Sequence, residues 1–206
     1  MKAAKALLAA DADARGGVSM RILKRVPEGG GLGGGSADAA STLLALNEMW
    51  KLGKSPEELA AIGASVGSDV PSLVLAQHYR RPVMMEGRGE RVRVLDNQEI
   101  AALGIGEFIV LVNPGVHSST ADVYKRCRPG QNFGNGLQAA ACELYPEIAT
   151  ALDALAFAGA KTPRMTGSGS TVFGFADNET SAKQIVAKMT NAGYISYLVH
   201  PATFCA

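Results

Sequence analysis

The sequence predicts an α/β protein in which helices cover a sheet in two layers. Short apolar runs typical of strands alternate with helix-like segments along the chain, which is the pattern of folds that mix both elements. A glycine-rich loop over residues 27–38 stands between a strand-like segment and an amphipathic helix. The 206 residues are enough for one large or two small domains, and we expect two, residues 1–100 and 101–206, with the boundary placed loosely near residue 100; no internal repeat is visible.

Composition narrows the class of protein. Hydrophobic residues make up 47% and charged residues 19%, and the net charge is +1. These ordinary values give no electrostatic reason to expect a nucleic-acid partner or a membrane surface. No apolar run approaches the about 20 residues that a membrane span needs. Three cysteines, Cys127, Cys142 and Cys205, share no metal-site spacing, so we expect reduced thiols and a cytoplasmic protein.

The first half reads as helices around the glycine loop, followed by a hairpin. Residues 3–11 are strong helix formers, and residues 18–26 alternate loosely enough to be a strand. The helix after the loop is expected from about Ala37 to Trp50, with Ser36 as its N-cap. The other elements expected here are a helix from the capping box Ser55-Pro56-Glu57-Glu58 to residue 67, a short helix or turn after residue 69, and strands over 83–86 and 91–95.

The second half continues the alternation of strands and helices. It opens with a buried strand over 108–112, closed by Asn113-Pro114-Gly115, and contains a second glycine-serine loop over 165–170. The other elements expected here are helices over 118–126, 137–144, 148–157 and 181–192, and strands over 171–175 and 194–199.

The glycine loop is the strongest functional signal. Six glycines fall within residues 29–35, interrupted only by Leu32. Glycine permits positive φ and close approach of another group, and backbone amides at a helix N-terminus favour negative charge. We therefore expect a bound phosphate. A flexible linker or a tight turn without a ligand remains the alternative.

Two other phosphate motifs fit poorly. Gly53-Lys54-Ser55 superficially resembles a P-loop, but Glu48 stands where that motif needs its first glycine, which excludes it. The loop also satisfies Gly-x-Gly-x-x-Gly, which its glycine density nearly guarantees. Because Pro27 and Glu28 separate the preceding segment from the glycines, a dinucleotide-binding turn, and with it an oxidoreductase, is the weaker hypothesis.

The ordered string from Pro27 to Ala40 resembles the phosphate loop of the GHMP kinase superfamily. Further stretches are similar to the same family: Gly67-Ser68-Asp69-Val70-Pro71, Gly87-Arg88-Gly89-Glu90, Asn113-Pro114-Gly115-Val116 with Ser119-Thr120, and Thr166-Gly167-Ser168-Gly169-Ser170. The triple glycine and the Gly67–Pro71 segment resemble the corresponding motifs of one branch of the superfamily, the branch whose members act in non-mevalonate isoprenoid synthesis. The resemblance runs from about residue 3 to the C-terminus.

The resemblance implies a GHMP kinase fold, with an N-terminal domain like ribosomal protein S5 and a ferredoxin-like C-terminal domain. Members of the family begin with additional strands that carry a catalytic lysine and an adjacent Tyr-His pair. Nothing here matches them, because Lys2 and Lys5 lie in a helical pattern. We therefore expect an incomplete N-terminal domain. The alternatives are a nucleotide-binding module without catalysis and another small-molecule kinase of the superfamily.

The implied activity is ATP-dependent phosphorylation of the 2-hydroxyl of 4-diphosphocytidyl-2-C-methyl-D-erythritol, with Mg²⁺. The implied ATP-binding residues are Pro27, Glu28, Gly29, Gly30, Gly31, Leu32, Gly33, Gly34, Gly35, Ser36 and Ala37. Ser36 would offer its hydroxyl to phosphate or Mg²⁺. Asp69 is implied as the catalytic base, although the bare sequence favours a helix cap at that position.

The resemblance also implies residues on the substrate side: Thr120, Tyr124, Gly167, Ser168 and Gly169. On sequence alone, the 167–170 segment could be a simple turn, and Tyr124 could be an ordinary core residue on a helix. The expected partner is a small-molecule substrate, without nucleic acid or membrane, and the chain is expected to be a monomer or weak dimer.

Overall fold

The computed structural model describes residues 1–11, 17–87, 89, 91–128 and 134–201 of the chain. Arg88 and Glu90 of the predicted Gly-x-Gly-Glu turn, and Cys205, lie outside the described residues. The chain forms two compact units, the first from Met1–Lys24 and Gly33–Gly104 and the second from Arg25–Leu32 and Ile105–Ala206. The division between Leu32 and Gly33 falls inside the glycine loop, so each half of the loop belongs to a different unit.

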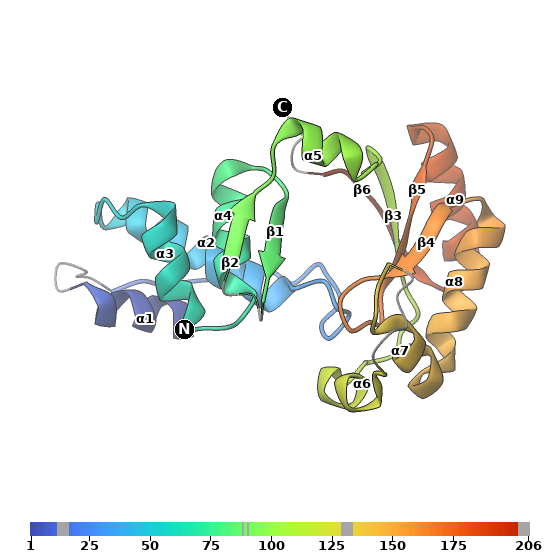
Figure 1. The fold of residues 1–206 in the computed structure, drawn as a ribbon, viewed down its shortest axis with the longest axis horizontal. Helices are drawn as coiled ribbons and strands as arrows, with labels where there is room; N and C mark the ends of the chain where they lie inside the picture. The colour runs from blue at the N-terminus through green and yellow to red at the C-terminus, as the bar shows by residue number, and fades with distance from the viewer. Residues whose placement is uncertain (12–16, 88, 90, 129–133, 202–206) are drawn as a thin grey trace. The chain divides into compact units, whose positions relative to one another are not determined.

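The first unit is a helical cluster with one hairpin (Figure 1). Helix α4 packs against α2, α3 and the hairpin, and buried aliphatic side chains such as Leu43, Leu59 and Val74 fill the space between them. Its elements are α1 (Lys2–Ala10), α2 (Gly34–Met49), α3 (Pro56–Ala64), α4 (Val70–Tyr79), β1 (Val83–Glu86), β2 (Arg91–Val94) and α5 (Asn97–Ala102).

Helix α3 begins as the sequence predicts. The Ser55 hydroxyl accepts a hydrogen bond from the Glu58 amide at 3.2 Å, and the Glu58 carboxylate accepts one from the Ser55 amide at 2.8 Å. Pro56 occupies the first helical position, where a missing N–H costs no intrahelical bond. The predicted hairpin is also confirmed, with Val83 opposite Val94 in an antiparallel pair.

Helix α2 begins earlier than predicted, and the N-cap assignment is wrong. The helix starts at Gly34, its N-cap is Gly33, and Ser36 lies within its first turn. Gly33 adopts a left-handed conformation with φ of +64°, which glycine enters at little cost. This conformation lets the chain turn directly into the helix, three residues before a conventional Ser cap would have allowed it.

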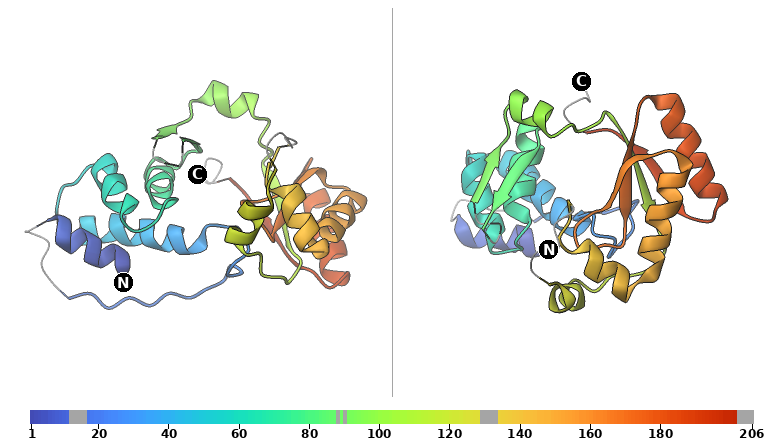
Figure 2. Two further views of the ribbon diagram at one scale, coloured as in Figure 1. Left: turned by 60° about the horizontal axis from the view of Figure 1, so that its bottom comes forward. Right: turned by 45° about the vertical axis from the view of Figure 1, so that its right-hand side comes forward.

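The strand predicted over residues 18–26 is also wrong. This part of the described chain contains no strand, and it is the long run before the glycine loop in the left-hand view of Figure 2. A strand needs a hydrogen-bonded neighbour, and no ladder pairs with this segment. Its apolar side chains stay largely exposed, with Ile22 at 53% and Leu23 at 71%.

The second unit is a sheet with helices on one face. Its strands are ordered β4-β5-β3-β6, and every neighbouring pair is antiparallel. Helices α8 and α9 cover one face of this sheet (Figures 1 and 2), where Val110, Val172 and Leu155 are fully buried. The elements are β3 (Phe108–Asn113), α6 (Thr120–Arg126), α7 (Gln138–Leu144), α8 (Pro146–Ala158), β4 (Lys161–Met165), β5 (Val172–Ala176), α9 (Glu179–Asn191) and β6 (Ile195–Val199).

Sequence analysis predicted these elements except β4, and in the first unit it missed α5. Strand β4 carries Pro163 and a left-handed Thr162 with φ of +46°, and its pairing with β5 shifts register between Lys161 and Arg164. Proline is tolerated there because β4 lies at the edge of the sheet. None of the helices in the described part of the chain combines the length and apolar character that crossing a membrane requires.

Candidate active site

The N-terminus of α2 has open space around two of its glycines. A Cβ built on Gly34 or on Gly35 would meet no heavy atom within 4 Å, and both residues have helical backbone. Neither packing nor conformation within the chain therefore requires glycine at these positions, although alanine favours a helix more. The first amides of a helix have no intrahelical partner. Because glycine has no side chain, these amides remain accessible to a ligand.

A pocket of about 430 Å³ in the first unit lies at this helix start. Gly33, Gly35 and Ser36 line it from α2, and Gly67 and Val70 line it from the turn into α4. These last two residues flank Ser68 and Asp69 in the sequence. The first unit thus brings the predicted phosphate-binding amides and the segment of the predicted base to the same pocket.

Asp69 occupies the N-cap position of α4, but its side chain makes no cap hydrogen bond. The Ser68 hydroxyl donates to the Asp69 carboxylate at 3.1 Å, and the Ser72 hydroxyl donates to the Asp69 carbonyl at 2.8 Å. Asp69 is exposed. Asp69 therefore stands at the cap position that the sequence favours, but its carboxylate is not engaged with the helix amides.

The first half of the glycine loop is held within the second unit. The Thr171 amide donates to the Gly30 carbonyl at 3.1 Å, and the Thr166 hydroxyl donates to the Gly31 carbonyl at 3.0 Å. A Cβ on Gly31, whose φ is +72°, would lie 2.4 Å from the Thr166 carbonyl oxygen. Glycine is required here by the chain itself, for conformation and for space.

Gly29 is exposed but lies against a side chain of the second unit. Its φ is +69°, and a Cβ built on it would lie 2.3 Å from Cδ2 of His117. The sequence gives His117 no ligand-type spacing with the other histidines. The side chain is exposed and its ring packs against the loop, so the structure adds it to the surroundings of the predicted nucleotide loop.

Two of the predicted substrate-side residues meet in the second unit. The hydroxyls of Thr120 and Ser168 are 2.8 Å apart, and the Ser118 hydroxyl donates to the Ser168 carbonyl at 2.6 Å. Gly167 and Gly169 have φ of +56° and +88°. The loop 166–170 joins β4 to β5 rather than a helix to a strand, and hydrogen bonds tie it to the segment that leads into α6.

Tyr124 lies on α6 with 63% of its surface exposed, so the alternative of an ordinary core residue is wrong. No described contact joins its ring to Thr120 or Ser168. Asn135, which sequence analysis missed, donates from Nδ2 to the carbonyls of Met165 at 2.9 Å and Gly167 at 2.8 Å. The bare sequence carried no signal for it, because the contact spans about 30 residues.

Charge around α2 is balanced locally. Lys24 forms an ion pair with Asp38 in the first unit.

Within the described ranges, no three His, Cys, Asp or Glu side chains gather closely enough to hold a metal ion. Mg²⁺ commonly takes few protein ligands and fills its shell with phosphate and water oxygens. Ser36 lines the pocket and carries a hydroxyl oxygen, the type of group that could take part in such a site.

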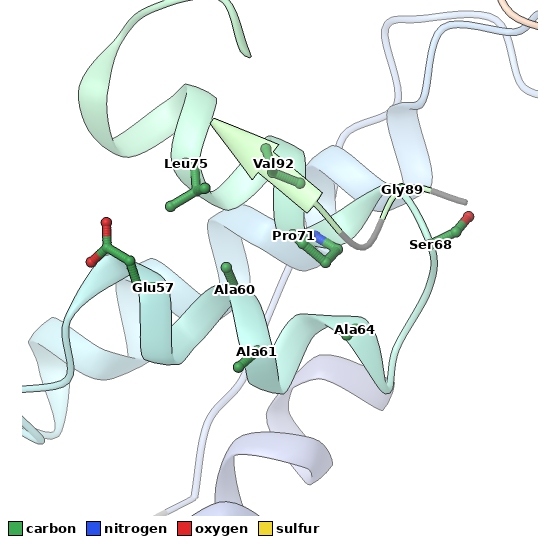
Figure 3. A pocket seen from close by; sticks show the side chains of 9 residues that line it. All are labelled: Glu57, Ala60, Ala61, Ala64, Ser68, Pro71, Leu75, Gly89 and Val92. Atoms are coloured by element: carbon green, nitrogen blue, oxygen red, sulfur yellow. The ribbon is translucent and has the colours of Figure 1, made fainter. Parts of the chain in front are cut away.

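A larger pocket of about 620 Å³ lies between α3, α4 and the hairpin of the first unit (Figure 3). Its wall is mostly small and apolar, with Ala60, Ala61, Leu75 and Val92 among the lining residues. The Glu57 carboxylate, also on the wall, accepts a hydrogen bond from the Tyr79 hydroxyl at 2.8 Å. An apolar wall with a carboxylate does not suit a triphosphate, so this pocket is not the candidate site.

Comparison with known families gives the chain two domain matches. Residues 1–77 match the sequence model of the GHMP kinases N terminal domain, and residues 127–195 match that of the GHMP kinases C terminal domain. The chain belongs to the GHMP kinase family. The matches confirm the predicted fold of this GHMP kinase. The expected boundary at residue 100 remains a prediction.

Curated relatives of this GHMP kinase are named 4-diphosphocytidyl-2-C-methyl-D-erythritol kinase. The protein of Citrifermentans bemidjiense is 37% identical over 210 residues, which cover 93% of this chain and 71% of that protein. The protein of Geobacter sp. strain M21 is 36% identical, covering 84% and 65%, and that of Aromatoleum aromaticum is 40% identical, covering 83% and 60%. The chain therefore matches about two thirds of the length of these relatives.

Solved structures agree with the family. The crystal structure of a 4-(cytidine 5'-diphospho)-2C-methyl-D-erythritol kinase has a TM-score of 0.79 and 29% identity, covering 96% of this chain and 76% of the other. A homoserine kinase from Cytophaga hutchinsonii has a TM-score of 0.64 at 15% identity, covering 85% and 67%. The second likeness concerns the fold alone.

Proposed function

We propose that this GHMP kinase transfers the γ-phosphoryl group of ATP to the 2-hydroxyl of 4-diphosphocytidyl-2-C-methyl-D-erythritol. The observation that carries the proposal is the open N-terminus of α2. There, Gly34 and Gly35 have no packing role in the chain, and their helix start lines the same pocket as the turn around Asp69. The names of the relatives supply the substrate. Homoserine or another small alcohol is the alternative within the superfamily.

The glycine loop, residues 27–37, is assigned to the triphosphate. Phosphoryl transfer depends mainly on positioning and on neutralising charge. Amides of Gly34, Gly35 and Ser36 at the positive end of the α2 dipole would bind the β- and γ-phosphates. The Ser36 hydroxyl would hold Mg²⁺, which neutralises phosphate charge when it is bound.

Asp69 is assigned as the base that accepts the proton of the substrate hydroxyl. Its carboxylate is exposed, does not cap α4, and is oriented by the Ser68 hydroxyl. A base must lie within hydrogen-bond reach of the proton it takes; the support for this role is that the Asp69 side chain is not used to cap α4 and that its neighbours Gly67 and Val70 line the pocket.

The substrate side is assigned to Thr120, Tyr124 and the loop 167–169. Thr120 and Ser168 present a hydroxyl pair, and the exposed Tyr124 ring offers a surface for a base or sugar. A cytoplasmic location, the absence of a nucleic-acid or membrane partner, and a monomer or weak dimer remain part of the proposal.

The test is a coupled kinase assay with Asp69→Asn, run on a protein that has the full length of the relatives. We expect turnover to fall about 10²- to 10⁴-fold, the usual range for losing a general base, with little change in Mg·ATP binding. Retained turnover would remove Asp69 from the base role. If homoserine is phosphorylated and 4-diphosphocytidyl-2-C-methyl-D-erythritol is not, the substrate assignment is contradicted. If the protein binds the nucleotide but phosphorylates neither compound, the kinase assignment is contradicted.

A further inference from the structure

Buried polar side chains gather beneath the first half of the glycine loop. Within the described residues, the buried polar side chains are Ser72, Asn113, Ser118, Ser170 and Thr171. All except Ser72 lie in the second unit, on the end of β3, the start of β5 and the segments next to them. Thr171 is 1% exposed and Asn113 is 6% exposed. A buried polar group is costly unless it is hydrogen-bonded, so this cluster calls for an explanation.

Asn113 and Thr171 form a connected pair. Nδ2 of Asn113 donates to Oγ1 of Thr171 at 3.0 Å, and Oδ1 of Asn113 accepts from the Gly115 amide at 2.8 Å. The Thr171 backbone amide donates to the Gly30 carbonyl at 3.1 Å. The pair therefore links the end of β3, the start of β5 and the glycine loop in one chain of hydrogen bonds.

The same two side chains form the floor under Gly30. A Cβ built on Gly30 would lie 2.8 Å from Oγ1 of Thr171 and 3.0 Å from Nδ2 of Asn113. Gly30 itself has no positive φ, so this close approach is the feature that requires glycine there. The depth at which the loop sits on the second unit is set by the Asn113–Thr171 pair.

We propose that Asn113 and Thr171 are positioning residues for nucleotide binding. The Thr171 backbone amide holds the Gly30 carbonyl and the two side chains lie against Gly30, and Gly30 is followed within a few residues by the amides assigned to the triphosphate. An apolar pair would pack without the cost of burying polar groups, but it would not dictate one orientation. The inference rests on the proposed function, since it assigns the pair to the ATP loop.

The decisive variant is Thr171→Val, which keeps the shape of the side chain and removes the acceptor for Asn113. Leaving the buried Asn113 donor unsatisfied should weaken Mg·ATP binding about fivefold or more, on the usual scale for such a loss. Thr171→Ser keeps the hydroxyl and should restore the dissociation constant to within about twofold of wild type. Thr150→Val, the same change on α8 away from the loop, is the matched control and should leave binding unchanged.

Calorimetric titration of Mg·ATP into a protein that has the full length of the relatives, as in the kinase assay, measures binding, and hydrogen exchange of the amides at residues 29–32 without nucleotide measures loop order. We expect faster exchange in Thr171→Val and Asn113→Leu, with rescue in Thr171→Ser. Equal affinity and equal exchange in wild type and Thr171→Val would overturn the inference and leave the proposed function intact. A wild-type chain that binds no Mg·ATP would overturn the proposed function, and the nucleotide role of the pair with it.

If Thr171→Val does not fold, Asn113→Leu provides the second variant. It replaces the side-chain amide by an apolar group of similar size, so no donor faces Oγ1 of Thr171 and no new charge is introduced. The expected result is the same loss of affinity with a cooperative thermal transition retained. Unchanged affinity in this folded variant would contradict the proposal.

Discussion

The two halves of the glycine loop contain the same residue for different reasons. In the first half, Gly29 and Gly31 have positive φ, and added Cβ atoms would collide with His117 or with the carbonyl of Thr166. In the second half, Gly34 and Gly35 are helical and face open space. The chain itself requires glycine at positions 29 and 31, whereas it does not at 34 and 35, where we propose that the open space accommodates the phosphates. Substitutions in the first half should therefore lower stability, whereas substitutions at Gly34 and Gly35 should weaken binding without lowering stability.

The largest expected effect is that of Gly31→Ala. The new methyl group meets backbone oxygens of Thr166 at 2.4 Å and Gly169 at 2.7 Å, in a conformation that strains any side chain. We expect a loss of about 2 kcal/mol or more in the free energy of unfolding, measured by denaturant titration, and loss of Mg·ATP binding. Stability and binding both near wild type would show that the first half is not held as described.

The matched change in the second half is Gly34→Ala. Alanine favours helix over glycine by up to about 1 kcal/mol, so stability should be unchanged or slightly higher. Mg·ATP binding should weaken about tenfold, because the methyl group obstructs the amides that bind phosphate. A calorimetric dissociation constant equal to that of wild type would break the comparison between the two halves.

A smaller effect is expected from Thr166→Val. The change removes the hydroxyl that donates to the Gly31 carbonyl and preserves the shape of the side chain. We expect about 1 kcal/mol of lost stability, the usual worth of one such hydrogen bond, and a modest rise in the dissociation constant of Mg·ATP. Thr166→Ser should behave as wild type in both measurements.

The smallest effect, and a control outside both halves, is Glu58→Gln. Hydrogen bonding with the Ser55 amide and hydroxyl lowers the pKa of Glu58 from 4.5. Because the folded pKa is depressed, the stabilisation is present above pH 4.5 and is lost as the pH falls through the folded value. Glu58→Gln should lessen the acid-side fall in thermal stability and leave Mg·ATP binding at pH 7 unchanged. An identical pH profile in both proteins would contradict the capping role.

Local signals made part of this fold predictable. Ser55, Pro56 and Glu58 define a helix start within four residues, and the glycine string identified the loop. The strand expected over 18–26 failed because strand formation depends on a neighbouring ladder, which lies outside any local pattern. Strand β4 was not predicted because it contains Pro163, and proline is compatible with a strand mainly at the edge of a sheet. Whether a strand lies at an edge depends on the whole sheet and is not visible in the local sequence.

The candidate site was predictable only in outline. The sequence indicated the loop, Asp69 and the 166–170 segment. It could not show that glycines in one string divide into an enclosed and an open half. The Asn113–Thr171 contact was also hidden, because it joins residues 58 positions apart and depends on the pairing of β3 with β5.

The most direct test is an NMR titration of the chain with Mg·ATP that follows the amide signals of residues 29–36. We expect the largest shifts, with slowed hydrogen exchange, at Gly34, Gly35 and Ser36, and smaller shifts at Gly29–Gly31, which other residues of the second unit already contact. Shifts confined to Gly29–Gly31, or none in the whole loop, would contradict the assignment of the open half to phosphate.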